Sequence, residues 1–223
     1  DGFATVPDPA DSQQGYAMSQ GGELVRFNLR TGTSKLVRPP APDGVELRFN
    51  WNAAIAIDPR EPATIYYGSQ FVHMSKDRGE SWTVLSPDLT SDKREWQQQA
   101  ESGGLTRDAT GAENHCTLMT IAPSPVQAGV IWTGSDDGLV HVTRDGGKSW
   151  ANVTPPGAPE WLQSNCIAAN PHVDGGCYVA ATRYKLDDFQ PYLWATTDFG
   201  KTWREINGGL DRAWFTRCIR PDP

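Results

Sequence analysis

The sequence is poor in positive charge and contains no long apolar run. Its 223 residues include 20 Lys and Arg against 27 Asp and Glu, which gives a formal net charge of −7. A nucleic acid or an anionic membrane surface attracts a concentrated positive patch, so this charge balance argues against both as partners. No apolar stretch approaches the roughly 20 residues of a membrane-spanning helix. We therefore predict no membrane span and no nucleic-acid ligand.

Histidine and cysteine are also scarce, with four residues of each. His73 and His141 occupy the same position in two copies of a repeat, and the third copy has Trp194 there. A position that accepts both His and Trp is a packing position. His115 is followed by Cys116, but neither the spacing nor further ligands match a zinc site. We therefore expect no metal and no cofactor.

Glycine, proline and tryptophan are abundant, with 22, 17 and 9 residues. One short pattern places Asp, Gly and Trp at fixed offsets in three copies: Asp77, Gly79 and Trp82; Asp145, Gly147 and Trp150; Asp198, Gly200 and Trp203. We predict a structural hairpin in which the Asp accepts backbone hydrogen bonds, the Gly adopts a conformation closed to other residues and the Trp is buried. A catalytic role is disfavoured because a catalytic residue is needed once, whereas a structural element recurs in every repeat. A degenerate copy near Asn28 carries a Thr31-Gly32 turn.

The repeats share a register that divides the chain into similar units. A proline-containing turn recurs five times near the end of a first strand, and four of these turns are followed by further strands. We predict four-stranded blades over residues 1–40, 50–90, 115–155 and 164–208, and the first strand of another blade over 214–223. The predicted fold class is thus all-β, a β-propeller fragment of four-stranded antiparallel blades, four blades plus one extra strand in an incomplete ring. Open blade faces would be covered by the remaining blades of a parent protein or by another chain.

Longer motifs resemble a known group of propellers. The segments 134–138, 142–150 and 197–203, with Phe49-Asn50-Trp51-Asn52 and 111–116, resemble BNR-repeat (Asp-box) β-propellers. Among these, they are most similar to secreted bacterial propellers labelled sortilin-like (VPS10) or glycosyl-hydrolase-like. The resemblance implies an exported, extracellular or periplasmic, non-catalytic scaffold that binds a peptide, protein or glycan. It leaves two alternatives open: a sialidase- or xyloglucanase-like hydrolase with its cleft completed by missing blades, and an assembly factor or subunit of a larger complex.

In such a propeller the connections between blades crowd one rim and the Asp-containing turns lie on the other, so ligand binding belongs to the first rim. The connection over 86–114 is longer than the ~12 to 15 residues typical of bare connections. It is either a solvated loop or a flap that grips a ligand. The predicted ligand-binding rim consists of Trp96, Arg107, Glu113, His115, Trp161, Arg183, Tyr184 and Trp214.

Hydrolysis of a glycosidic bond needs two carboxyl groups about 5 Å or about 6.5 to 9.5 Å apart. The candidate catalytic residues are Glu113, Asp136 and Asp137. The sequence indicates no defined pair among them, and an Asp-Asp-Gly run is typical of a turn. The three-arginine cluster of sialidases cannot be assembled from Arg48, Arg107, Arg183 and Arg217.

Two cysteines suggest a bridge. Cys166 and Cys177 lie symmetrically about the turn at Pro171 and His172, so we predict that they face each other on adjacent antiparallel strands. A disulfide between them would suit an exported protein, and a buried thiol is the alternative. Cys218 occupies the register of Cys166 one blade later, and we expect these two not to touch.

Overall fold

Strands account for nearly all the regular structure of the protein. The computed structural model describes residues 2–98 and 114–222, and these contain sixteen strands and three single-turn 3-10 helices. The helices are η1 (Gln20–Gly22), η2 (Arg94–Trp96) and η4 (Tyr184–Leu186). In this described part of the chain no helix is long and apolar enough to cross a membrane.

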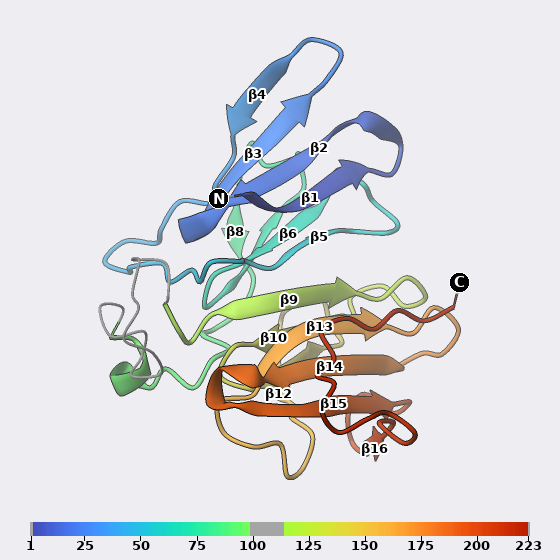
Figure 1. Cartoon of the computed structure of the whole chain (residues 1–223). Helices are drawn as coiled ribbons and strands as arrows, with labels where there is room; N and C mark the ends of the chain where they lie inside the picture. Colours follow the sequence, from blue (N-terminus) through green and yellow to red (C-terminus); the bar gives the residue numbers. More distant parts are fainter. Residues whose placement is uncertain (1, 99–113, 223) are drawn as a thin grey trace. The chain divides into compact units, whose positions relative to one another are not determined.

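The strands form four antiparallel sheets of four strands, and each strand neighbours the next one along the chain (Figure 1). Sheet 1 contains β1 (Gly2–Asp8), β2 (Asp11–Ser19), β3 (Glu23–Asn28) and β4 (Thr33–Leu36). Sheet 2 contains β5 (Ile55–Ile57), β6 (Ile65–Gly68), β7 (Val72–Ser75) and β8 (Thr83–Val84). Sheet 3 contains β9 (Leu118–Pro123), β10 (Ile131–Ser135), β11 (Val140–Thr143) and β12 (Ala151–Asn152). Sheet 4 contains β13 (Gln163–Ala169), β14 (Cys177–Arg183), β15 (Asp188–Thr196) and β16 (Arg204–Glu205).

The chain divides into two compact units. Unit 1 comprises Asp1–Asp88 and Asp92–Leu118 and holds sheets 1 and 2. Unit 2 comprises Leu89–Ser91 and Met119–Pro223 and holds sheets 3 and 4. The prediction that all four sheets belong to one propeller stays a prediction.

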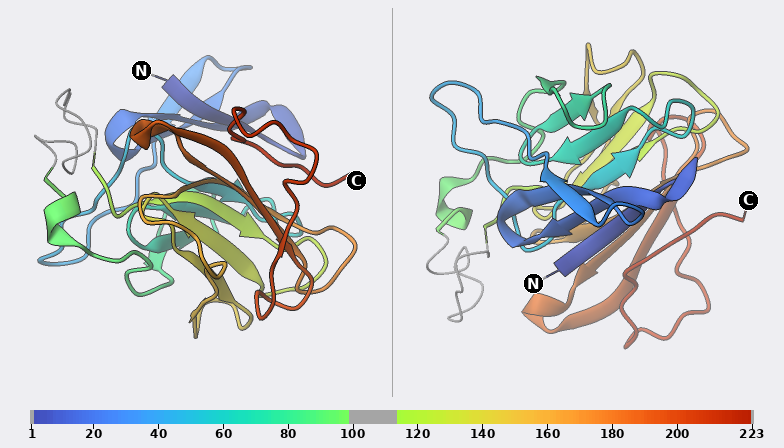
Figure 2. Two further views of the ribbon diagram at one scale, coloured as in Figure 1. Left: turned by 60° about the horizontal axis from the view of Figure 1, so that its bottom comes forward. Right: turned by 90° about the horizontal axis from the view of Figure 1, so that it is seen from above.

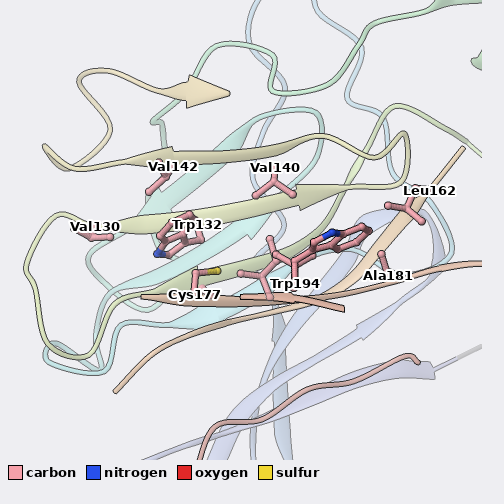
Figure 3. Close-up of a cluster of buried hydrophobic side chains, with 11 residues drawn as sticks. Val130, Trp132, Val140, Val142, Leu162, Cys177, Ala181 and Trp194 are labelled. Atoms are coloured by element: carbon pink, nitrogen blue, oxygen red, sulfur yellow. The ribbon is translucent and has the colours of Figure 1, made fainter. Parts of the chain in front are cut away.

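The core of unit 2 lies between sheets 3 and 4 (Figure 3). Trp132 and Val140 come from sheet 3, whereas Cys177 and Trp194 come from sheet 4, and all four are at most 5% exposed. Trp132 also meets the ring of Trp203 edge to face, with the centroids 6.3 Å apart. Strands whose two faces are both covered read as nearly continuous apolar runs, which explains the run of buried residues in β10 and β14.

Unit 1 has an equivalent core between its two sheets. Tyr16 and Leu24 of sheet 1 pack in one cluster with Ile65 and Tyr67 of sheet 2, and none of the four is more than 1% exposed. Phe49, in the connection between the sheets, lies with its ring centroid 5.8 Å from that of Tyr67. Each unit is therefore held together by apolar side chains that two neighbouring sheets bury between them.

The turn after the first strand of each sheet is closed by a short polar side chain. Asp58 Oδ1 accepts a hydrogen bond from Arg60 N at 2.9 Å, and Asn170 Oδ1 accepts one from His172 N at 2.8 Å. Asp8 and Ser124 make the same contact with the residue two positions later. This recurring Asx or Ser turn is the structural basis of the proline-containing repeat read from the sequence.

The three Asp-Gly-Trp segments adopt one geometry, in which the Asp accepts hydrogen bonds from its own turn and the Gly has a positive φ. In the second copy, Asp145 accepts hydrogen bonds from Ser149 N at 2.9 Å and from Ser149 Oγ at 2.6 Å. Thr143 Oγ1 donates to the same carboxylate and accepts from Gly147 N. The corresponding bonds recur around Asp77 and around Asp198. The glycines have φ of 87°, 93° and 76°, a region closed to most residues with a Cβ.

Two of these hairpins also contact the preceding sheet of their own unit. Trp82 Nε1 donates to Val37 O at 2.9 Å, and Trp203 Nε1 donates to Val153 O at 2.7 Å. A Cβ on Gly79 would lie 2.8 Å from Val37 Cβ, and one on Gly200 would lie 2.6 Å from Val153 Cβ. The Asp-Gly-Trp hairpin therefore closes its own turn and also holds the neighbouring sheet.

The degenerate copy in sheet 1 uses the same principle with an amide in place of the carboxylate. Asn28 Oδ1 accepts hydrogen bonds from Arg30 N at 3.0 Å and Thr31 N at 3.3 Å. Gly32 follows with φ of 66° and completes the turn between β3 and β4. The sequence interpretation of this segment as a hairpin of the same kind is confirmed.

The C-terminal segment differs from the prediction. Residues 214–222 form no strand, although a further first strand was predicted over 214–223. Instead the segment runs beside sheet 4, as both views of Figure 2 show, and Ile219 packs against the cluster of Cys166, Ala180 and Leu193. The segment thus packs on sheet 4 through its side chains and forms no strand ladder with the described residues.

Candidate functional site

The two ends of the sheets in each unit carry different connections. The turn after the first strand binds the Asp-Gly-Trp hairpin of the same sheet: Gly146 N donates to Gly129 O at 2.9 Å, and Phe199 N donates to Gly175 O at 3.0 Å. Arg78 N makes the equivalent bond to Ala63 O at 3.0 Å in sheet 2. These hairpins therefore occupy the end of the sheet where the first turn lies. The connections between second and third strands, and those between sheets, lie at the other end.

In unit 2, four of these connections meet. We call this group the unit 2 rim and define it as residues 136–138, 160–162, 183–189 and 214–215. A Cβ on Gly138 would lie 3.1 Å from Leu162 O, which places the first two segments in contact. Arg183 Nε donates to Glu160 O at 2.8 Å, and the ring of Tyr184 stacks on Phe215 with centroids 5.4 Å apart.

A hydrogen-bonded group fixes the base of the unit 2 rim. Arg183 Nη1 donates to Asp188 Oδ2 at 3.2 Å, and Tyr192 Oη donates to the same oxygen at 2.6 Å. Burial alone would raise the pKa of Asp188, but the hydrogen bonds from Tyr192, the Gln190 backbone and Arg183 outweigh it and lower the pKa. Burial and the neighbouring carboxylate raise the pKa of Tyr192 to about 12. Asp188 is therefore an anion whose oxygens are already bound, and the Arg183 guanidinium is held in place.

Above this base the unit 2 rim presents exposed aromatic rings. Trp214 is 68% exposed, Phe189 43% and Phe215 39%. Phe215 lies between Tyr184 and Phe189, with the latter centroid 6.2 Å away. Rings fixed by stacking lose little conformational freedom when a ligand binds, which is why aromatic side chains dominate binding surfaces.

Trp161 adds an unusual backbone conformation to the same rim. Its φ is 62°, in the left-handed region that bulky side chains rarely adopt. Such conformations cost about 1–3 kcal/mol and concentrate at binding and active sites. The structure thus brings four predicted rim residues together. Trp161 follows Glu160, whose carbonyl oxygen binds Arg183. Tyr184 stacks on Phe215, which follows Trp214.

The candidate catalytic residues Asp136 and Asp137 are turn residues. They are 2% and 7% exposed. Asp137 accepts hydrogen bonds from Ser135 Oγ and, at 2.7 Å, from Ser91 N, and Gly138 follows with φ of 91°. Asp137 is therefore held in a turn by Ser135 and Ser91, and the catalytic role of Asp136 and Asp137 stays a prediction.

Two residues predicted for the rim are buried in unit 1. Trp96 is 7% exposed, and the Lys93 ammonium lies 3.9 Å from the centroid of its indole ring. His115 is 3% exposed. The expectation that these two side chains face a ligand is therefore wrong for this structure. Arg107 and Glu113 lie outside the described residues.

His73 shows why a suggestive histidine is a packing residue. It is 1% exposed, and its Nε2 lies 2.8 Å from Ser69 Oγ. Burial lowers the pKa of His73 to about 4, so the imidazole is neutral near pH 7. In the described part of the chain, no group of three His, Cys, Asp or Glu side chains is arranged to hold a metal ion.

The predicted contact of Cys166 with Cys177 is wrong. Cys177 pairs with Ala169 across the strands, and Cys166 pairs with Ala180. Because the two cysteines are an odd number of positions apart in this ladder, they point to opposite faces of sheet 4. Cys177 joins the core of Figure 3, whereas Cys166 packs with Ala180 on the other face. No disulfide is formed among the four cysteines.

Arg48 and Phe215 make contacts that the sequence did not predict. Arg48 binds Asp88 at 2.6 Å, Asp92 at 3.1 Å and Cys116 O at 3.1 Å, which ties three loop segments of unit 1 together. Phe215 holds the stacked rings of the unit 2 rim. Its position beside Trp214 was the only available signal.

Comparisons with known proteins identify the fold. No protein-family model matches this chain, and no curated protein sequence matches it. The GH74 xyloglucanase from Xanthomonas campestris is 22% identical, with a TM-score of 0.56 over 91% of this chain and 30% of the enzyme. The Dos1 propeller is 12% identical, with a TM-score of 0.59 over 96% of this chain and 50% of its own. The RRP9 WD40 repeats are 10% identical, with a TM-score of 0.57 over 92% of this chain and 50% of theirs.

The chain thus spans 30% of the xyloglucanase and 50% of the other two proteins. At these identities the similarity concerns the fold alone. The protein is an all-β β-propeller fold with four-stranded antiparallel blades, as predicted. The similar structures include both hydrolases and WD40 propellers, so they select no single activity.

Proposed function

We propose that this chain is a non-catalytic binding scaffold of an exported, sortilin-like Asp-box propeller, and that it binds a peptide, protein segment or glycan at the unit 2 rim. The observation that carries the proposal is the group of exposed rings at Phe189, Trp214 and Phe215, built on a fixed base. Flat aromatic faces bind both apolar side chains and the apolar faces of sugars. Arg183 contributes a positive charge at the base of the same surface.

The state of the carboxylates favours binding over hydrolysis. Asp188 is occupied by Tyr192 and Arg183, and Asp137 is occupied by Ser135 and Ser91. A glycosidase needs one carboxyl group that donates a proton and a second that attacks or activates water. On the described part of the unit 2 rim, neither of these carboxylates is placed to act in this way.

The test is a binding screen of the protein against a glycan array and a displayed peptide library. We expect saturable binding to members of one of these panels. The change Trp214→Ala or Phe215→Ala should weaken that binding at least about tenfold, because exposed aromatic anchors carry most of an interface's energy. The matched control is Leu29→Ala, a residue 62% exposed in the β3–β4 hairpin, which should leave affinity unchanged. Unchanged affinity in both rim variants would reject this site.

A glycoside hydrolase is the second candidate, and the similarity to the GH74 xyloglucanase favours it. In that case the cleft is completed by further blades, with Glu113, Asp136 or Asp137 as catalytic groups. Measurement of new reducing ends on xyloglucan and other glycans separates the two functions. Turnover that is lost in Glu113→Ala or Asp137→Ala, in variants with unchanged circular dichroism, would replace the scaffold proposal.

A subunit of a larger complex is the third candidate. The similarity to the WD40 repeats of RRP9 shows that this fold also occurs in repeat propellers outside the hydrolases. Suppose a partner protein co-purifies in fixed stoichiometry and still co-purifies with the Trp214→Ala variant. This result would favour a structural subunit over a rim-binding scaffold.

A further inference from the structure

Two sulfur atoms from distant parts of unit 2 are in contact, so the expectation that Cys166 and Cys218 do not touch is wrong. Cys166 Sγ lies 4.0 Å from Cys218 Sγ, although 52 residues separate them. Cys166 belongs to β13, whereas Cys218 belongs to the C-terminal segment that runs beside sheet 4 (Figure 2). A disulfide bond is about 2.05 Å long, so the two atoms need to approach by only about 2 Å.

The two sulfur atoms differ in solvent exposure, and this difference decides which of them a reagent reaches first. Cys166 is 6% exposed and packs with Ala180 and Leu193, and its thiol donates to Ile219 O at 3.4 Å. Cys218 is exposed, so a reagent in solvent reaches it first. Burial and the nearby Cys166 raise the pKa of Cys218, which slows its reaction but does not block it.

A positive charge is also in contact with the buried sulfur. Arg220 Nη1 contacts Cys166 Sγ and donates to Ile219 O at 2.8 Å. Arg220 therefore holds a fixed positive charge in contact with Cys166 Sγ and anchors the C-terminal segment beside this sulfur.

We propose that Cys166 and Cys218 are a reactive thiol pair that forms an intramolecular disulfide with a low-molecular-weight disulfide such as oxidised glutathione. In the first step the Cys218 thiolate attacks one glutathione sulfur, the glutathione disulfide bond breaks, and one glutathione thiol leaves. In the second step the Cys166 thiolate attacks the Cys218 sulfur and displaces the second glutathione thiol. The sum is two protein thiols and one oxidised glutathione converted to one protein disulfide and two reduced glutathiones.

The other two cysteines provide an internal comparison. Cys177 is fully buried in the core, and burial raises the pKa of its thiol well above the usual value. Cys116 is also fully buried and lies in unit 1. The exchange is therefore selective for the Cys166–Cys218 pair.

The bond would join the C-terminal segment covalently to β13. This segment also carries Phe215, whose ring stacks on Tyr184, and the exposed Trp214. The oxidised form would therefore hold 214–222 on sheet 4, and the reduced form would hold it by packing alone.

The test is a thiol count and a peptide map of the native protein after incubation with oxidised glutathione. We expect the free thiols, measured after unfolding, to fall from four to two, with a cross-linked peptide pair containing Cys166 and Cys218 and full reversal by dithiothreitol. Cys166→Ser should accumulate glutathione on Cys218, because the second step is blocked. Cys116→Ser should still form the cross-link.

Two results would overturn the proposal. One is an unchanged thiol count in the native wild-type protein. The other is a wild-type protein that keeps glutathione on Cys218 and yields no cross-linked peptide. Both readouts use the unmodified chain, so the outcome does not depend on how well a variant folds.

Discussion

The indole nitrogen of Trp203 donates a hydrogen bond to the carbonyl oxygen of Val153, 2.7 Å away and 50 residues earlier in the chain. Val153 follows the last strand of sheet 3, and Trp203 precedes the last strand of sheet 4. Trp82 makes the same contact with Val37 between sheets 1 and 2. The same hydrogen bond thus connects two of the three Asp-Gly-Trp hairpins, one in each unit, to the preceding sheet.

Trp203→Phe should lower the free energy of unfolding of the protein by about 1 kcal/mol, because it keeps most of the ring and removes the bond to Val153. Trp203→Ala should cost more, about 2–4 kcal/mol, because the contact with Trp132 is lost as well. Urea unfolding followed by circular dichroism measures both. Trp214→Phe, at a 68% exposed position, should change stability by less than about 0.5 kcal/mol. Equal effects of the two Trp→Phe changes would contradict the structural role of Trp203.

Gly200→Ala should destabilise the protein by at least about 2 kcal/mol. The residue has φ of 76°, and a Cβ there would lie 2.6 Å from Val153 Cβ, so backbone strain and a clash add together. Gly208→Ala is the matched control, because nothing lies within 4 Å of its Cβ position. The comparison requires only the midpoints of thermal unfolding of the two variants. A Gly200→Ala variant as stable as Gly208→Ala would show that the hairpin does not meet the preceding sheet.

The hairpin aspartates predict a loss of stability in strong acid. Hydrogen bonds from the side chain and backbone of the following Ser or Thr lower the pKa of Asp77, Asp145 and Asp198 from 3.8 to about 2. A carboxyl group whose pKa is lowered by folding stabilises the folded state above its unfolded pKa, and this stability is lost as the pH falls through the folded pKa. The unfolding temperature should therefore drop between about pH 4 and pH 2.

Asp145→Asn tests this assignment. The variant should be less stable than the wild type at pH 7, and the difference should shrink between pH 4 and pH 2, where the wild-type carboxylate becomes protonated. Asp174→Asn, at an exposed turn position, is the control. A constant difference at every pH would show that the charge of Asp145 does not matter.

The buried His73 predicts a loss of stability in a second, separate pH range. Burial lowers its pKa from 6.5 to about 4, so the unfolded state binds a proton more readily than the folded state. The stability is full above about pH 6.5 and decreases as the pH falls towards 4, by at most about 1.4 kcal/mol per pH unit. His73→Phe should flatten the pH dependence of the unfolding temperature between pH 7 and pH 4 and leave the decrease below pH 4 in place. An unchanged slope in this variant would mean that His73 is not the titrating group.

The hairpins could be predicted from the sequence because each is specified locally. Thr143 Oγ1 accepts the hydrogen bond of Gly147 N, and Asp145 accepts that of Ser149 N. All four residues lie within seven positions, so spacing alone fixes the geometry. The same local rule applied to Asn28 identified the degenerate copy. The four sheets follow from these turns and from the apolar strands between them.

The cysteine register could not be predicted because the length of its turn is not visible in the sequence. The turn between β13 and β14 is centred on Val173, where Gly176 N donates to Val173 O, and not on Pro171. Pro171 lies near the start of this turn. Taking Pro171 as the centre therefore shifted the predicted partner of every residue in β13 and β14. For this reason Cys166 lies opposite Ala180 and not opposite Cys177.

The rim was predicted only in part, because burial of a loop side chain depends on contacts far along the chain. Arg183 ends β14 and Tyr184 follows it, so both lie in the connection where the sequence placed them, and their ligand-binding role stays a prediction. Trp96 was placed wrongly because a polar sequence context suggested exposure, whereas the side chain is buried under Lys93. The stacking of Phe215 on Tyr184 joins residues 31 positions apart, which no periodic pattern encodes.

Hydrogen exchange of the protein with and without the tightest-binding member of the glycan or peptide panel tests the central claim most directly. If recognition belongs to the unit 2 rim and the Asp-Gly-Trp hairpins are structural, protection should increase over 160–162, 183–189 and 214–215. The hairpins at 75–82, 143–150 and 196–203 should exchange at the same rate in both states. Protection gained at the hairpins, with none at the rim, would contradict the account.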